Sequence, residues 1–195
     1  LRLVGSEMCI RDSPIITKGG DLVNNVPSDV RMELYVRAKT MEAIDCQHRR
    51  VDEALKAGGA AVGAKTVIET LPGMFPLACS PRLNDLFVEN IKEYFPETKI
   101  EDAGHFTAST DMGDISHLMP SIHPFIGGVD GGLHTKDFCV TDFDAAAILP
   151  GKVFAMNIID LLYDEAAMAK EILEKEKPIL TKEEYLAKLE SYFQS

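Results

Sequence analysis

The chain has 195 residues, of which 46% are hydrophobic, 7% aromatic and 26% charged, which is the composition of a globular protein. Its 31 acidic and 20 basic residues give a formal net charge of −11. This charge argues against a nucleic-acid partner, because no basic surface is available to neutralise phosphates. We identify no apolar run of the roughly 18 residues that a membrane span needs, so we also expect no membrane partner.

The four cysteines form no C-x-x-C pair and lie far apart at positions 9, 46, 79 and 139. This spacing is typical of reduced thiols and predicts a cytoplasmic location. Residues 1–13 (LRLVGSEMCIRDS) lack the apolar core and the small-residue cleavage site of a signal peptide. We interpret them as a doubtful, non-native leader.

Alternating apolar and polar side chains over residues 30–37 predict a strand with one polar face. Thr40 follows as a helix N-cap, and the helix after it should weaken or end at Gly58-Gly59. Residues 66–69 then predict a short strand. This part of the chain is therefore expected to be a small α+β unit.

A second region begins at Ser80-Pro81, an N-cap with proline in the first turn of a helix that Pro96 should stop. Residues 100–140 are rich in histidine and glycine and are expected to form loops, where functional sites tend to lie. Apolar spacing predicts a further helix over residues 153–162. The last helix is expected to start at a Thr181/Glu184 capping box and to bury Tyr185, Leu186, Leu189 and Phe193.

Imidazole and carboxylate groups gather in the sequence between residues 109 and 134, and such groups bind zinc or manganese. The candidates are His117, His123 and His134 with a nearby aspartate. Their spacing matches no established zinc motif, so two interpretations stay open. The histidines either form a mononuclear zinc site or are structural.

Arg37 has two interpretations as well, and Asn24 has one. Arg37 is either an exposed cation near the end of a strand or a fork that binds a substrate carboxylate. Asn24 precedes Val26-Pro27 and is by default a turn residue.

Three motifs in this order resemble the dinuclear-metal amidohydrolases and peptidases, the family of aminoacylase, carboxypeptidase G and aminobenzoyl-glutamate hydrolase. They are Gly19-Gly20 with NNVP and Arg37, then STDMGDISHLMPSIHP, then GGLHTKDF. The last two are most similar to the amidohydrolase branch. The resemblance implies an α/β fold: part of a three-layer metallohydrolase catalytic domain with part of an α+β (ferredoxin-like) lid. It places the second half of the lid/dimerisation domain at residues 14–74 and the C-terminal part of the catalytic domain at 75–195.

The resemblance also implies roles for individual residues. His134 matches the last metal-ligand histidine, Arg37 the lid arginine that binds the substrate carboxylate, and Asn24 the lid asparagine that holds the scissile carbonyl. Thr110 and Asp111 match a turn at the pocket wall that contacts substrate or supports the residues that do, and that is not catalytic. The implied reaction is attack on an amide carbonyl by a water between two divalent metal ions, zinc or manganese.

Two departures from the family pattern matter. Phe138 stands where many relatives have a glutamate four residues after the last histidine. In addition, the resemblance implies that the family's H-x-D motif, bridging aspartate and paired Glu-Glu lie in an N-terminal half that this chain does not contain. We therefore expect a fragment, inactive by itself, of a homodimeric enzyme that acts on N-acyl amino acids or dipeptides. The alternative is a non-catalytic binding or oligomerisation module.

Overall fold

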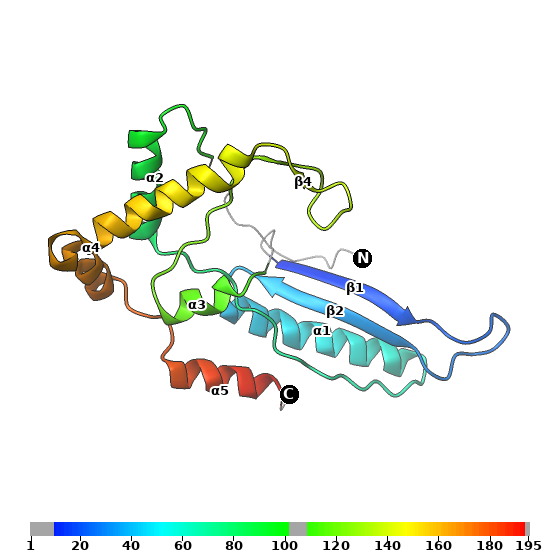
Figure 1. Ribbon diagram of the computed structural model, residues 1–195. Coiled ribbons are helices and arrows are strands. Elements are labelled where there is room, and N and C mark those ends of the chain that lie inside the picture. Colours follow the sequence, from blue (N-terminus) through cyan, green and yellow to red (C-terminus); the bar gives the residue numbers. More distant parts are fainter. Residues whose placement is uncertain (1–9, 102–108, 194–195) are drawn as a thin grey trace. The chain divides into compact units, whose positions relative to one another are not determined.

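The computed structural model describes residues 10–101 and 109–193. Helices dominate these residues and two small antiparallel sheets accompany them, so the fold is broadly α/β (Figure 1). The contacts divide the described chain into two units. The first unit contains residues 10–76, 109–111 and 186–193, and the second contains 77–101 and 112–185. Whether these units correspond to a lid and a catalytic domain stays a prediction.

The sheet of the first unit is a hairpin of β1 (Ile10–Lys18) and β2 (Arg31–Ala38) (Figure 1). The sequence predicts β2 but not β1, because Pro14 interrupts the pattern of β1 and cannot donate a ladder hydrogen bond. In a two-stranded sheet β1 is an edge strand, where proline is tolerated. Residues 10–13 of β1 belong to the segment that we interpret as a leader, and that interpretation stays a prediction; residues 1–9 lie outside the described residues.

Toward the C-terminal end of β2 its two faces differ as the alternating pattern predicts, although Met32, farther back on the apolar face, is exposed. Leu34 and Val36 are half-buried and Ala38 is buried, whereas Glu33 and Tyr35 on the other face are exposed. Side chains of a strand point alternately to its two faces, so one face can pack while the other stays open. This end of β2 therefore has one covered face and one more open face.

Helix α1 (Met41–Ala61) packs against β2 and runs alongside the hairpin (Figure 1). Thr40 is its N-cap, as predicted, and its hydroxyl oxygen accepts a hydrogen bond from the Ala43 N–H at 3.2 Å. The helix does not end at Gly58-Gly59, since it continues to Ala61, and whether the pair weakens it stays a prediction. Glycine costs only about 1 kcal/mol in a helix interior.

The predicted strand over residues 66–69 does not form. Instead, this segment follows α1 and is held by side chains. The Thr66 hydroxyl donates to the Leu55 carbonyl at 3.5 Å, and the Thr70 hydroxyl lies 3.2 Å from His48 Nε2. A strand needs a neighbouring strand for its backbone hydrogen bonds, and local sequence does not supply one.

Helix α5 (Lys182–Tyr192) starts at the predicted capping box. The Thr181 N–H donates to Glu184 Oε2 at 2.8 Å, and the Glu184 N–H donates to Thr181 Oγ1 at 3.2 Å. The predicted burial was wrong in part. Leu186 and Phe193 are exposed, and only Tyr185 and Leu189 are half-buried.

The C-terminal part of α5 is tied to α1 through one carboxylate. Lys188 Nζ donates to Asp45 Oδ2 at 2.6 Å, and Tyr192 Oη donates to Asp45 Oδ1 at 2.7 Å. Burial alone would raise the pKa of Asp45, but these two hydrogen bonds and the charge of Lys188 outweigh it and lower that pKa. Burial, together with the bond to Asp45, raises the pKa of Tyr192.

We expect this contact to stabilise the fold most between about pH 5 and pH 9. The lowered pKa of Asp45 means that its contribution is present above the ordinary value near 4 and is lost as the pH falls through the folded-state pKa. The raised pKa of Tyr192 means that its contribution is lost only at strongly alkaline pH. Urea unfolding should show Asp45→Asn less stable than the parent at pH 7 by under about 1 kcal/mol, because the pair is partly exposed. A difference that persists unchanged at pH 2.5 would contradict this account.

The second unit is built on α2 (Pro81–Tyr94) and α4 (Leu149–Lys175), which pack against each other. Ser80 caps α2 as predicted, because its hydroxyl oxygen accepts from the Leu83 N–H at 3.1 Å. Phe87, Ile91 and Val153 form the buried core between the two helices.

Helix α4 corrects the prediction that no stretch is apolar enough to span a membrane. Together with the π-helical turn η1 (Asp144–Ile148) it contains an 18-residue window with a mean hydropathy of 1.6. Residues 163–166 interrupt the helix with non-helical backbone angles. By its length and composition this helix could cross a membrane. A single helix of this kind does not show that the chain spans a membrane.

Candidate functional site

The segment that carries Thr110 and Asp111 leads directly into the short helix α3 (Met112–Leu118). The Thr110 hydroxyl donates to Asp111 Oδ1 at 3.1 Å. Thr110 is half-buried and Asp111 is exposed. The structure therefore brings these two predicted substrate contacts together, at the start of a helix that the sequence did not predict.

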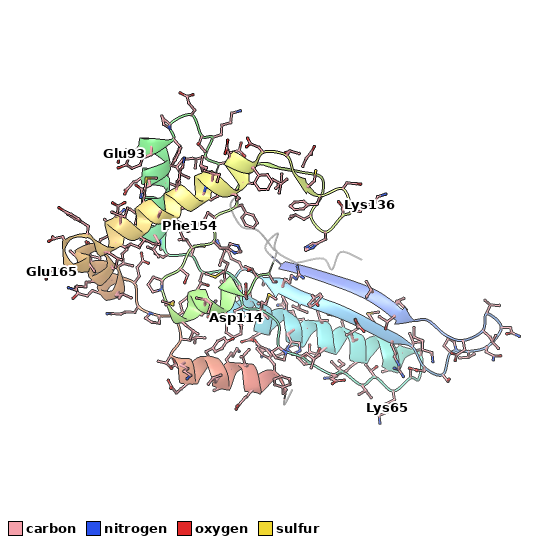
Figure 2. The ribbon with its side chains drawn as sticks, in the orientation of Figure 1. Lys65, Glu93, Asp114, Lys136, Phe154 and Glu165 are labelled. Atoms are coloured by element: carbon pink, nitrogen blue, oxygen red, sulfur yellow. The ribbon has the colours of Figure 1, made fainter. Side chains whose placement is uncertain are left out.

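The polar side chains of α3 serve the fold of the second unit. Ser116 Oγ donates to the Gly113 carbonyl at 2.7 Å and accepts from the Ala78 N–H at 3.0 Å. His117 Nδ1 lies 2.9 Å from the Gly113 oxygen, and the His117 carbonyl accepts from the Leu180 N–H at 2.9 Å. Both side chains are buried, so these contacts satisfy polar groups that would otherwise be costly. Another bond on α3 joins Asp114, labelled in Figure 2, to the Tyr185 hydroxyl at 3.1 Å.

His134 lies in a loop between two very short strands, β3 (Val129–Asp130) and β4 (Cys139–Val140). The base of this loop is closed by the Gly128 carbonyl, which accepts from the Thr141 N–H at 2.9 Å. His134 is exposed and has a left-handed backbone conformation, with φ of 63°. Lys136 of the same loop extends into open space (Figure 2).

Gly131 allows the loop to turn. Its φ of +83° suits glycine, and a Cβ atom there would overlap the Asp137 carbonyl oxygen. We expect Gly131→Ala to lower stability by at least about 1 kcal/mol and to shift the NMR resonances of His134. Gly127→Ala is the matched control, because nothing lies within 4 Å of the Cβ position at Gly127. Equal effects of the two substitutions would show that the turn does not depend on Gly131.

The three candidate histidines do not converge on a metal site. Within residues 10–101 and 109–193, no group of three or more His, Cys, Asp or Glu side chains could hold a metal ion. His117 is buried in the contacts described above. His123 stacks on Phe125 with ring centres 5.7 Å apart, and its buried Nδ1 has no hydrogen-bond partner in the described structure. The described residues alone therefore do not form a mononuclear zinc site, nor do they fit a centre of two metal ions.

Asn24 and Arg37 lie toward opposite ends of the hairpin. Asn24 is exposed in the connection between β1 and β2, whereas Arg37 is near the far end of β2 (Figure 1). The six residue steps from Arg31 to Arg37 correspond to about 20 Å of strand. A dipeptide backbone spans only about 7 Å. The two side chains therefore start from widely separated parts of the hairpin.

Arg37 is half-buried and makes no salt bridge with a carboxylate in the described part of the chain. Other arginines do: Arg31 lies 3.0 Å from Asp29, and Arg82 lies 3.1 Å from Glu89. The guanidinium of Arg37 instead lies over the ring of Tyr35, 5.0 Å from its centre. No sequence motif singles out Tyr35, although its position two residues before Arg37 places it on the same face of the strand.

Comparison with known proteins points to peptidases. No family model matches the chain, and no solved structure matches it significantly. The chain is similar to Xaa-Arg dipeptidase of Mus musculus, with 29% identity over 79% of this chain and 38% of that protein. It is also similar to Xaa-Arg dipeptidase of Homo sapiens, with 24% identity over 76% of this chain and 36% of that protein. These similarities support a peptidase or amidohydrolase family and do not single out the aminobenzoyl-glutamate branch. The chain spans less than two fifths of the length of these curated relatives.

Proposed function

We propose that this chain is part of a metal-dependent amidohydrolase or peptidase that cleaves the amide bond of a dipeptide or an N-acyl amino acid. The observation that carries the proposal is the similarity to two dipeptidases over 79% and 76% of the chain. Arg37 is half-buried and has no salt bridge within the described residues, which supports a substrate with a free carboxylate, since a guanidinium fork binds such a group through two parallel hydrogen bonds.

Each site residue has a role in this proposal. Arg37 binds the substrate carboxylate, and the Asn24 amide donates to the carbonyl of the scissile bond. Thr110 and Asp111 line the pocket. His134 is one ligand of two divalent metal ions, zinc or manganese, which would activate water, and the other ligands and the general base come from residues outside this chain.

The proposed enzyme is a cytoplasmic homodimer that pairs through the lid. The separation between Asn24 and Arg37 supports the dimer, because two copies can place one of these residues each on a single dipeptide. Exposed apolar side chains in the described part of the chain, such as Val26, Ile159 and Leu162, are consistent with surfaces that the longer protein covers.

The proposal is tested by comparing the 195-residue chain with the longer reading frame that contains it. We expect the longer protein, supplied with zinc or manganese, to hydrolyse dipeptides and the chain alone to be inactive. Arg37→Gln should raise KM roughly 10- to 150-fold for a dipeptide with a free carboxylate, which corresponds to about 1.5 to 3 kcal/mol. It should leave KM for the C-terminally amidated dipeptide unchanged. Turnover by the 195 residues alone, or no hydrolysis by the longer protein, would refute the proposal.

A further inference from the structure

We propose that Tyr35 is a positioning residue that holds the Arg37 guanidinium ready to bind a carboxylate. This inference deepens the proposed function and rests on it where it identifies that carboxylate as part of the substrate. Tyr35 lies on the open face of β2, with 63% of its surface exposed, and its ring is within reach of the guanidinium carbon of Arg37 at 5.0 Å.

The chain has no shortage of carboxylates to pair with Arg37, since it contains 31 acidic residues. Arg31 and Arg82 both bind such groups. Arg37 differs from them in that its described neighbour is an aromatic ring. A ring attracts the cation through its π electrons but supplies no oxygen acceptor, so the N–H groups of the guanidinium keep their capacity for an external anion.

A flexible arginine loses side-chain entropy when it binds a ligand, and a contact that orders the side chain beforehand reduces that loss. The position of Tyr35 two residues before Arg37 places both side chains on one face of the strand, where each can restrict the other. In this proposal the aromatic ring of Tyr35 orders the Arg37 side chain. The hydroxyl group of Tyr35 is not required.

The test is an NMR titration of the 195-residue chain that follows the side-chain Nε–Hε resonance of Arg37, assigned with Arg37→Gln. The probe is sodium N-acetylglycinate. N-acetylglycinamide, which lacks only the charge, is the neutral comparison at equal ionic strength. The variants are Tyr35→Leu, which removes the ring, and Tyr35→Phe, which keeps it. Tyr94→Leu is the matched control, because Tyr94 is also an exposed tyrosine, with 55% of its surface accessible.

We expect the carboxylate, and not the amide, to shift the Arg37 resonance. Tyr35→Leu should raise the Kd about two- to fivefold, the size of effect of an exposed cation–π contact. Tyr35→Phe and Tyr94→Leu should leave it unchanged. An unchanged Kd in Tyr35→Leu, an equal loss in Tyr35→Phe, or equal shifts by the amide would overturn the inference.

The result is separable from the outcome for the proposed function. Suppose that the carboxylate binds in a Tyr35-dependent way but the longer protein hydrolyses no dipeptide. This result would refute the proposed enzyme and support the carboxylate site. Dipeptide hydrolysis with a KM that is the same in Tyr35→Leu and the parent would refute the positioning role alone. The thermal unfolding midpoint of each variant shows whether the hairpin has stayed folded.

Discussion

Replacing His134 by alanine should lower the dipeptide hydrolysis of the longer enzyme by more than about 100-fold. Loss of a residue that only supports a metal ligand already costs roughly 10- to 100-fold, and loss of a ligand costs more. His134 is exposed in its loop, so the substitution should change the free energy of unfolding little. The measurement is kcat/KM together with the metal content of the purified protein.

The backbone at His134 calls for a second variant. Its φ of 63° lies in the left-handed region, which asparagine adopts more readily than alanine does. His134→Asn should therefore preserve the loop and still lose activity. His123→Gln is the comparison, and we expect it to keep the activity per folded molecule. Full activity of His134→Asn would remove His134 from the proposed metal centre.

Truncating Phe87 to alanine should destabilise the second unit by about 3 to 5 kcal/mol. Its side chain is 6% exposed and lies in the core that α2 and α4 share. The ring centre of Phe87 is 5.3 Å from that of Phe154, which Figure 2 labels on α4. The substitution removes this contact and leaves a cavity that rigid helices fill only partly. Urea unfolding followed by circular dichroism measures the loss.

Tyr94→Ala on the same helix is the control for this prediction. Tyr94 is 55% exposed, so its truncation should change the free energy of unfolding by no more than about 0.5 kcal/mol. If the two variants unfold at the same urea concentration, the packing of α2 on α4 contributes little to the stability of the chain.

Local sequence signals predicted the starts of helices well. Thr40, Ser80 and the Thr181/Glu184 pair each make the capping hydrogen bonds expected of them. A cap depends on a side chain and a backbone N–H only two or three residues apart, so the necessary information is contained in a few neighbouring residues.

Signals that depend on distant partners were less reliable. Residues 66–69 have no neighbouring strand in the described structure and do not form the predicted strand. Strand β1 forms despite Pro14 because it pairs with β2 as an edge strand. Leu186 and Phe193 share an apolar pattern with Leu189, yet both are exposed. Which face of a helix is covered depends on the neighbouring elements, and a single helix carries no information about them.

The candidate site also has features that the sequence predicts and features that only the structure shows. The residue types and motif order in the sequence were sufficient to select Asn24, Arg37, Thr110, Asp111 and His134, and their functional roles stay proposals. Within the described residues, the structure does not gather His117, His123 and His134 into a group that could hold a metal ion, and it places Asn24 and Arg37 in different parts of the hairpin.

The sequence by itself determined the helix caps, the polar and apolar faces of β2 and the resemblance to amide hydrolases, because each depends on residues close together or on the order of motifs. Only the tertiary structure decided that Arg37 lies over Tyr35 without a carboxylate partner in the described chain, and that Ser116 and His117 stabilise the fold. The lack of a carboxylate beside Arg37 in the described chain, and the bonds that join Ser116 to Ala78 and His117 to Leu180, depend on which groups from distant segments meet. That outcome follows from packing and burial of the whole chain, which local periodicity does not encode.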